Sequence, residues 1–222
     1  MVNYEFSEID AFKFFKEKIL ENIKVKKVYV KWYINMKKRL DNNWKENPSK
    51  GGGIIYNYVC HSIYYLEFLF GKINSLKVNI SQKTNRKNKF LKGTFFFNSG
   101  LSAKVNIKVG TIPKKIKPTH QLRILSTKKT YILKTDLNSL ADKFKLITFN
   151  NKFNKKENNL LKAEKNKYDF RLKPTFVNSK KFAKSILEGK NENPSFFDAK
   201  RIHLIIQKMI NSSKTEKKIY IN

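Results

Sequence analysis

Short segments in which apolar residues alternate with polar ones constrain the fold of this chain more than any other feature. The run Leu76–Ile80 (LKVNI) is one example, and two longer runs flank Asn98-Ser-Gly100, which has the composition of a hairpin turn. Such period-two runs, joined by short turns, predict strands of a mostly antiparallel sheet. We expect these strands over residues 26–35, 76–80, 93–97, 101–109, 121–126, 130–135, 146–149 and 218–221.

Helical periodicity flanks and interrupts these strands. Phe12, Phe15 and Ile19 recur at helical spacing near the start of the chain, and Gly71 supplies a C-terminal stop for a long apolar run. Helices combined with hairpin-linked strands predict an α+β fold. We expect one domain over residues 1–222, with a polar surface loop at about 150–168. We expect the helices over residues 9–22, 53–70, 176–188 and 197–212.

The composition is that of a globular protein, with 40% hydrophobic residues and a formal net charge of +31. No run approaches the roughly 20 uncharged apolar residues that a membrane span requires. The start of the chain lacks the basic and apolar regions of a secretion signal. The single cysteine, Cys60, excludes an internal disulfide. We therefore expect a cytoplasmic protein with no membrane partner.

The positive charge leaves two interpretations open. A net charge of +31 attracts nucleic acid. Only five of the 48 basic residues are arginine, however, and arginine provides the bidentate contacts used in specific recognition of bases and phosphates. An AT-rich coding sequence would also produce a chain this rich in Lys, Asn, Ile and Phe. We expect nucleic acid to bind only nonspecifically, through charge.

Three glycines, residues 51–53, precede an apolar run that holds Asn57 and His61. A glycine-rich turn before a helix could cradle a phosphate or let backbones pack closely. The spacing of four places Asn57 and His61 on one helical face. His61 could then act as a general acid or base, or it could be a hydrogen-bonded core residue. No second histidine or carboxylate lies at ligand spacing, so we expect no metal site.

Three consecutive phenylalanines, residues 95–97, also allow two interpretations. In a lysine-rich sheet they could stack on nucleobases. Two of them would lie on one face of a strand and one on the other, so a core strand covered on both faces would explain them as well.

Several segments, in order along the chain, resemble the Gfo/Idh/MocA family of NAD(P)-dependent sugar and polyol oxidoreductases. GGGIIYNYVCHSIYYLEFLFGKINSLKVNI is similar to that family's glycine-rich turn, histidine-bearing helix and following strand. GTFFFNSGLSAKVNIKV is similar to its hairpin, and NPSFFDAKRIHLIIQKMINSSKTEKKIYI to its closing helix and strand. The resemblance implies the family's C-terminal domain, an open, mostly antiparallel sheet with helices packed on one face.

In that family the substrate lies between this domain and a Rossmann domain that holds the nicotinamide, and the sheet often forms the subunit interface. The resemblance therefore implies a sugar or polyol substrate, a homo-oligomer formed through the sheet, and a separate Rossmann polypeptide as partner. His61 would correspond to the family's helix histidine, a candidate for proton transfer, and Asn57 to the position of its acidic partner. Trp44, Lys45 and Tyr64 are further candidates for substrate binding.

The chain also departs from the family pattern. Asn57 replaces the usual Asp and could not act as a base, and Val59 and Tyr64 differ as well. No Rossmann fingerprint or Glu-Lys-Pro segment occurs, so we expect this chain to bind no NAD or NADP alone. We expect a fragment or split-gene product that is inactive by itself. The alternatives are an inactive domain that serves as a dimerising interaction module, and a basic nucleic-acid-binding protein.

Overall fold

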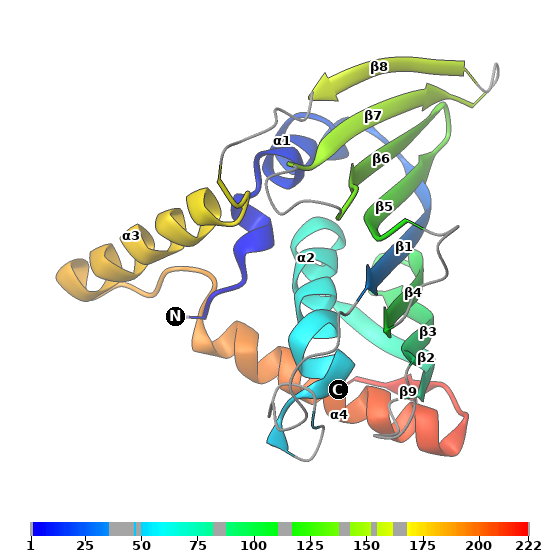
Figure 1. The fold of residues 1–222 in the computed structure, drawn as a ribbon, viewed down its shortest axis with the longest axis vertical. Helices are drawn as coiled ribbons and strands as arrows, with labels where there is room; N and C mark the ends of the chain where they lie inside the picture. Colours follow the sequence, from blue (N-terminus) through cyan, green and yellow to red (C-terminus); the bar gives the residue numbers. More distant parts are fainter. Residues whose placement is uncertain are drawn as a thin grey trace.

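The computed structural model describes residues 2–35, 47, 50–81, 88–110, 117–137, 143–151, 155–161 and 168–221 (Figure 1). Its helical elements are η1 (Glu5–Glu8), α1 (Asp10–Lys18), η2 (Leu20–Asn22), the π-helical turn η5 (Ile55–Val59), α2 (Cys60–Phe70), α3 (Leu172–Glu188) and α4 (Phe196–Thr215). Its strands are β1 (Val25–Asn35), β2 (Ile73–Ser81), β3 (Asn88–Phe97), β4 (Ser102–Gly110), β5 (Thr119–Ser126), β6 (Lys129–Thr135), β7 (Lys145–Asn150), β8 (Lys155–Leu161) and β9 (Ile219–Tyr220).

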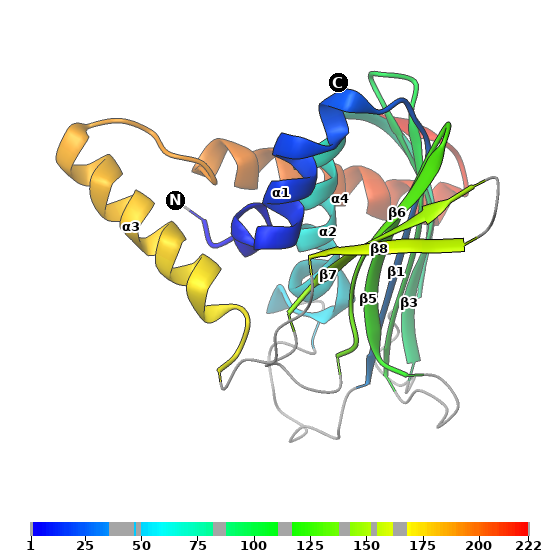
Figure 2. The ribbon, with the colours of Figure 1, turned by 90° about the horizontal axis from the view of Figure 1, so that it is seen from above.

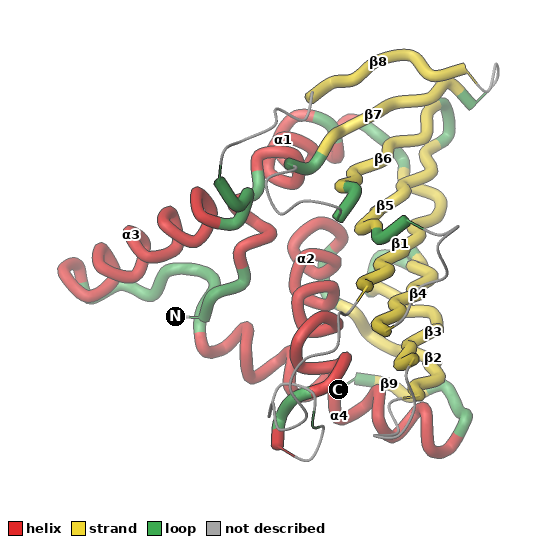
Figure 3. The backbone as a smooth tube through the Cα atoms, in the orientation of Figure 1, coloured by secondary structure: helices red, strands yellow, loops and turns green. Residues whose placement is uncertain are grey.

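The nine strands form one sheet in the order β8-β7-β6-β5-β1-β4-β3-β2-β9. Neighbouring strands are antiparallel except for β1 and β4, which run parallel. Figure 3 shows the strands side by side, and the view from above in Figure 2 shows α1, α2 and α3 on one side of the sheet, with α4 running past its β2/β9 edge. The α+β fold with an open, mostly antiparallel sheet and helices on one face is confirmed.

The alternating pattern of each strand separates a covered face of the sheet from an open one. In β1, Val28, Val30 and Trp32 are buried beneath the helices, whereas Lys31 between them is exposed. Helix α2, which is apolar around most of its circumference, lies on the covered face and packs against α4, which itself contacts β2 and β9. Helix α2 adds Ile63, Tyr65, Leu66, Leu69 and Phe70 to a core that the strands, the N-terminal helices and α4 share.

Strand β2 lies beside the short edge strand β9, and serines of α4 bind two of the β2 backbone N–H groups that β9 does not reach. Strand β9 pairs with β2 only at Ser75 and Leu76. Beyond that point, Val78 N donates to Ser212 Oγ (3.1 Å) and Ile80 N donates to Ser213 Oγ (2.9 Å). The last turns of α4 thus take the place of a longer strand and protect the edge from pairing with other chains.

The structure corrects one detail of the sequence-based prediction and confirms another. The polar segment 150–168, expected to be a surface loop, contains β8, which pairs with β7. The predicted helix over 53–70 is confirmed, and the π-helical turn η5 lies within it. Gly51 and Gly53 have φ angles of 76° and 84°, and a Cβ at Gly51 would meet nothing within 4 Å. Gly51 is therefore required for its backbone conformation rather than for close packing.

Candidate functional site

His61 lies in the first turn of α2, immediately after η5. Its ring centroid is 5.8 Å from that of Tyr4 and 5.8 Å from that of Phe6. Its Nδ1 atom is buried and has no hydrogen-bond partner among the residues that the structure describes. Single π-helical turns within helices are frequent at functional sites. Because an unpartnered buried nitrogen is costly, a ligand hydroxyl bound to it would be stabilised.

The fold brings a second histidine, His120 of β5, into the same cluster. Its ring stacks on Trp32 of β1, with centroids 3.9 Å apart and planes 8° apart, and its Nε2 lies 3.1 Å from the Tyr65 hydroxyl. The Phe6 ring lies within 6.0 Å of the rings of His61, Trp32 and His120. Trp32 Nε1 is also buried, and within the described ranges it has no partner. Two unpartnered ring nitrogens therefore belong to residues around Phe6.

Both imidazoles are neutral at pH 7. Burial lowers the pKa of His61, an effect that the Glu5 carboxylate opposes and the Arg171 guanidinium reinforces. Burial lowers the pKa of His120 well below its usual value, and the proximity of His61 lowers it further. A neutral imidazole can accept a hydrogen bond or a proton from a hydroxyl group.

Charged groups from two distant parts of the sequence act on His61. Arg171, just before α3, is bound to Asp169, with Arg171 Nη2 2.6 Å from Asp169 Oδ2. This hydrogen bonding lowers the pKa of Asp169 and raises that of Arg171. Glu5 comes from η1 at the other end of the chain. Sequence reasoning did not identify these residues or His120, because only the tertiary fold brings them near His61.

The other residues proposed from the sequence lie in different places. Asn57 is half-buried in η5, four residues before His61. Tyr64 stacks on Tyr4, with centroids 4.8 Å apart, and its hydroxyl donates to Ser7 Oγ (3.4 Å). Tyr64 lines a pocket of about 290 Å³ to which His61 does not contribute. Trp44 and Lys45 lie outside the described residues.

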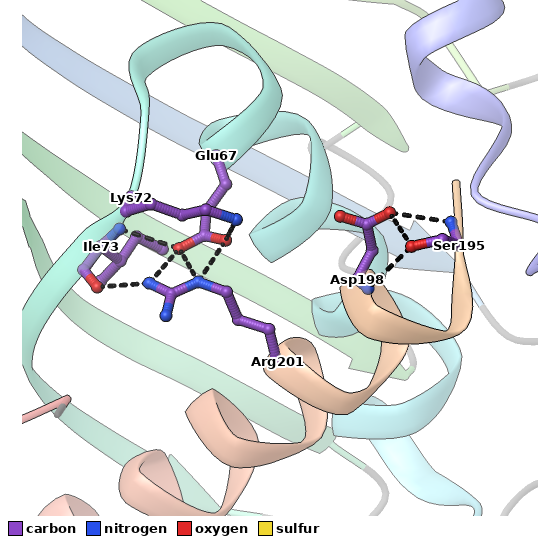
Figure 4. A network of polar contacts seen from close by, with 6 residues as sticks. All are labelled: Glu67, Lys72, Ile73, Ser195, Asp198 and Arg201. Atoms are coloured by element: carbon purple, nitrogen blue, oxygen red, sulfur yellow. Dashed lines mark hydrogen bonds and ion pairs between the residues drawn. The ribbon is translucent and has the colours of Figure 1, made fainter. Parts of the chain in front are cut away.

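A polar network fixes α2, and with it His61, against α4 (Figure 4). Glu67 of α2 accepts three hydrogen bonds from Arg201 of α4: Nη2 donates to Oε1 (2.8 Å), and Nε donates to Oε1 (3.0 Å) and to Oε2 (2.9 Å). Glu67 Oε1 also accepts from Ile73 N (2.8 Å), and Arg201 Nη2 donates to Ile73 O (2.9 Å). A capping box between Ser195 and Asp198 begins α4. These bonds join α2, α4 and the start of β2.

Two kinds of feature are missing from the part of the chain that the structure describes. It holds no group of three His, Cys, Asp or Glu side chains placed to bind a metal ion. None of its helices combines the length and apolar character needed to cross a membrane.

The fold is shared with solved oxidoreductases. It is similar to levoglucosan dehydrogenase in complex with NADH, with a TM-score of 0.75, 13% identity, and coverage of 100% of this chain and 66% of that chain. It is similar to an oxidoreductase from Agrobacterium radiobacter in complex with NAD+, L-tartaric acid and magnesium, with a TM-score of 0.73, 12% identity, and coverage of 100% and 64%.

A regulatory protein has the same fold. The transcriptional regulator Gal80p from Kluyveromyces lactis gives a TM-score of 0.75 at 17% identity, with coverage of 98% of this chain and 61% of that chain. This chain therefore spans just under two thirds of the length of these proteins. Comparison with curated protein sequences gave no match.

The family is established by the sequence rather than by these distant structural likenesses. The family model described as the oxidoreductase family, C-terminal alpha/beta domain, matches residues 16–221, which is nearly the whole chain. The order of the strands and the position of the helices agree with that assignment. The chain belongs to the Gfo/Idh/MocA oxidoreductase family, of which it represents the C-terminal alpha/beta domain.

Proposed function

We propose that residues 1–222 form the substrate-binding and oligomerisation domain of a cytoplasmic sugar or polyol dehydrogenase whose cofactor is held elsewhere. The observation that carries this proposal is the buried, unpartnered Nδ1 of a neutral His61, at the partly exposed end of an aromatic cluster. The substrate class is supported by levoglucosan dehydrogenase, whose structures include complexes with NADH and levoglucosan and with NADH and L-sorbose.

His61 would bind one hydroxyl of such a substrate and accept its proton. A substrate hydroxyl that donates to Nδ1 would satisfy a nitrogen that has no hydrogen-bond partner among the described residues. When an alcohol is oxidised to a carbonyl, the hydroxyl loses its proton, and a neutral imidazole is a suitable acceptor. Asn57 could orient a second hydroxyl but could not take a proton.

A nicotinamide dinucleotide does not fit the residues of this chain. Dinucleotide sites of the Rossmann type use parallel strands, each followed directly by a helix with a glycine-rich first turn. In the described residues, one strand pair is parallel, β1 and β4, and its members are separated by α2, β2 and β3. The whole sequence contains no G-x-G-x-x-G. The proposal therefore assigns cofactor binding to a Rossmann domain outside residues 1–222.

Ligand titration of the purified chain tests this proposal without any cofactor. Levoglucosan, L-sorbose and myo-inositol would be titrated into the wild-type chain, His61→Ala, and the control His203→Ala, which changes an exposed histidine. We expect millimolar binding of at least one sugar or polyol to wild type and His203→Ala, weakened tenfold or more in His61→Ala. Binding that is absent, or equal in all three, contradicts the proposal.

Self-association through the sheet is the second part of the proposal, and the open face supports it because no described helix covers that face. A groove of about 610 Å³ lies on this face, lined by Lys31, Lys104 and Arg123 among others. A two-fold contact here would bring like charges together, so we expect association to strengthen with salt. Sedimentation at 0.05 and 0.5 M NaCl would measure this. A salt-independent monomer contradicts it.

An inactive interaction module is the alternative that a specific observation favours. Gal80p shows that a transcriptional regulator can have this fold. Asn57 in place of the family's Asp fits a domain that has lost catalysis. A stable oligomer with no affinity for sugars or polyols would favour this alternative over the dehydrogenase domain.

A further inference from the structure

The open face of the sheet carries many basic side chains and no acidic ones over five consecutive strands. These strands are β5, β1, β4, β3 and β2, and their sequences contain no Asp or Glu. Figure 2 shows α1, α2 and α3 on the other side of the sheet. The exposed basic residues on the open face of these strands include Lys31, Lys77, Lys92, Lys104, Lys108 and Arg123.

Composition alone does not explain this separation of charge. The chain has 17 Asp and Glu residues, and five of them lie in its first 21 residues, which include η1 and α1. A coding bias toward lysine would act along the whole chain, and it would not clear one face of the sheet of carboxylates. The positive charge of the open face is therefore a property of that face.

The register of the strands places each of these basic residues between neutral neighbours. Because neighbouring strands lie about 4.8 Å apart, the cations of the first row below recur about every 10 Å over a width of roughly 19 Å. The neutral positions between the cations hold aromatic, amide and hydroxyl side chains. The three rows across the sheet are Arg123-Tyr29-Lys104-Thr94-Lys77, Gln121-Lys31-Asn106-Lys92-Asn79 and Thr119-Tyr33-Lys108-Phe90-Ser81.

The aromatic rings of these rows present their faces to the cations. Lys31 Nζ lies 4.7 Å and Lys108 Nζ 5.3 Å from the centroid of the Tyr33 ring. Lys92 Nζ lies 5.7 Å from the centroid of the Phe90 ring. Both rings are half-buried, and an ammonium group over a ring shows that this ring face is not packed in the core. A nucleobase can stack on such a face when the lysine moves to a phosphate.

A groove of about 610 Å³ lies in the middle of these rows, and Tyr29, Lys104, Asn106 and Arg123 are among the residues that line it. In the described part of the chain, the ion pairs involve other side chains, so no carboxylate there neutralises Lys104 or Arg123. Asn106 Nδ2 donates to the Tyr33 hydroxyl (3.1 Å), and Asn106 Oδ1 has no partner among the described residues. The groove therefore combines unneutralised positive charge, an aromatic ring and an unused acceptor.

We propose that the open face binds single-stranded RNA, with its phosphates on the lysines and Arg123 and its bases on the aromatic rings. Positive charge that tracks a backbone, interleaved with rings that stack on bases, is the arrangement of proteins that bind single strands. A duplex hides its base faces and would use only the charge. Lysine contacts a phosphate as a point charge, so we expect little dependence on base sequence.

The amide groups of the second row favour RNA over single-stranded DNA. Gln121 and Asn106 lie on either side of Lys31, and an amide can donate to or accept from a hydroxyl. The 2′-hydroxyl of RNA is the group that lets a protein distinguish RNA from DNA. The proposed cytoplasmic location also makes RNA the single strand that this chain would meet.

This inference goes beyond the proposed function, because it concerns the face of the sheet that His61 does not share. It does compete with self-association, since a second copy seated on the open face would exclude RNA. At low salt the like charges oppose self-association and attract RNA, and at high salt both effects weaken. We therefore expect bound RNA to keep the chain monomeric.

Fluorescence anisotropy with a labelled oligouridylate of about 12 nucleotides tests the proposal. The variants are Lys104→Gln/Arg123→Gln, which removes two charges from the groove, and Tyr29→Leu, which removes the ring between them. The control Lys13→Gln/Lys18→Gln removes two charges from exposed positions of α1. Circular dichroism would first show that all the proteins are folded.

We expect wild type and the α1 control to bind the single strand equally well. With four phosphate contacts, affinity should fall about 50-fold between 0.05 and 0.2 M NaCl. Lys104→Gln/Arg123→Gln should bind at least tenfold more weakly at 0.05 M NaCl, with a salt slope reduced by about 1.4. Tyr29→Leu should bind at least fivefold more weakly with an unchanged slope, because a stacking contact is lost and no charge.

Competitors decide what the face recognises. We expect an oligouridylate–oligoadenylate duplex, oligodeoxyuridylate and phosphatidylcholine/phosphatidylglycerol vesicles each to compete less well than the single-stranded RNA. The proposal is overturned if the groove variant and the α1 control lose affinity equally, since the net charge alone then drives binding. Equal competition by the duplex, the DNA strand or the vesicles also overturns it, because the face then recognises phosphate groups of any source.

The outcome is independent of the sugar-binding proposal. Sugar binding depends on His61, and RNA binding on the open face. If the chain self-associates at 0.5 M NaCl but binds no RNA at 0.05 M NaCl, the oligomerisation proposal stands and the RNA-binding face is wrong. If RNA binds as described and no sugar does, the RNA-binding face stands and the substrate-binding function is wrong.

Discussion

The two faces of the sheet come from the same strands but have opposite chemistry. The covered face is apolar and aromatic, and its histidines are neutral. On the open face, Lys31, Lys104, Lys108 and Arg123 are exposed, and strands β1 to β7 and β9 contain no Asp or Glu at all. Because side chains alternate between the two faces along each strand, the basic residues lie on the open face and the apolar residues form the buried core. The net charge of +31 is therefore compatible with an ordinary α+β core.

Truncation of neighbouring phenylalanines should show the difference between the faces most strongly. Phe95 is fully buried on the covered face, whereas Phe96 is half-buried on the open face with Lys218 Nζ 4.2 Å from its ring centroid. We expect Phe95→Ala to lower the free energy of unfolding by about 3–5 kcal/mol, because it leaves a cavity in the core. Phe96→Ala should cost about 1 kcal/mol, from lost partial burial and a cation–π contact. Urea unfolding of both variants would measure this. Similar losses for the two would contradict the separation of the faces.

The covered face also depends on the polar bonds that hold α4 over it. Arg201→Met would remove the bidentate contact to Glu67, whose side chain is 10% exposed, and the bond to Ile73 O. We expect a loss of about 1.5–3 kcal/mol in the free energy of unfolding, because hydrogen bonds to a largely buried charge are lost. Lys200→Met, at the neighbouring exposed position, is the matched control and should change stability by less than about 0.5 kcal/mol. Equal effects of the two would show that the network contributes nothing.

The neutral histidines of the covered face should make the fold sensitive to acid. Because their folded-state pKa values are lowered, the unfolded chain binds more protons than the folded chain once the pH falls below about 6.5. Stability is then fully present above that pH and is lost as the pH falls, by up to about 1.4 kcal/mol per pH unit for each histidine. The pKa of Asp169 is also lowered, but its contribution to stability is lost only when the pH falls below about 4, the ordinary pKa of an aspartate.

Unfolding in urea at pH 7.5, 6.5 and 5.5 would check this prediction. His120→Gln should be less stable at every pH, because the Trp32 stack is lost, but its stability should fall less steeply with pH. A wild-type stability that does not change between pH 6.5 and 5.5 would contradict the burial of neutral histidines.

The sequence predicted the two faces but not everything that lies on them. The strands were predictable because their period-two alternation is strong, and α2 because a long apolar run ends at Gly71. Strand β8 was missed because it is polar and extends the sheet at its edge, where apolar residues are not needed. The exposure of Phe176, Phe182 and Leu187 on α3 could not be predicted, because periodicity shows that a helix has an apolar side but not whether that side faces the core or the solvent.

The candidate site was predicted only where its residues are close in sequence. The spacing of Asn57 and His61 directed attention to one end of α2. The neighbours that set the chemistry of His61, among them Glu5, His120 and Arg171, come from η1, β5 and the residue before α3. Tertiary packing brings these residues together, and no local pattern in a single sequence predicts contacts between residues so far apart along the chain.

The smallest expected effect concerns the open face, and it tests whether repulsion among the basic residues there lowers the stability of the fold. Lys104 lies in the open-face groove with Lys31 and Arg123, and no carboxylate lines that groove. We expect Lys104→Glu to stabilise the fold by roughly 0.2–1 kcal/mol, because an attraction replaces a repulsion between neighbouring strands. The gain over Lys104→Gln should shrink between 0.05 and 1 M NaCl as the charges are screened. Urea midpoints of wild type and both variants at the two salt concentrations would measure it. If Lys104→Glu is instead destabilising at low salt, an anionic group already neutralises this face, and the basic surface then contributes to binding as well as to solubility.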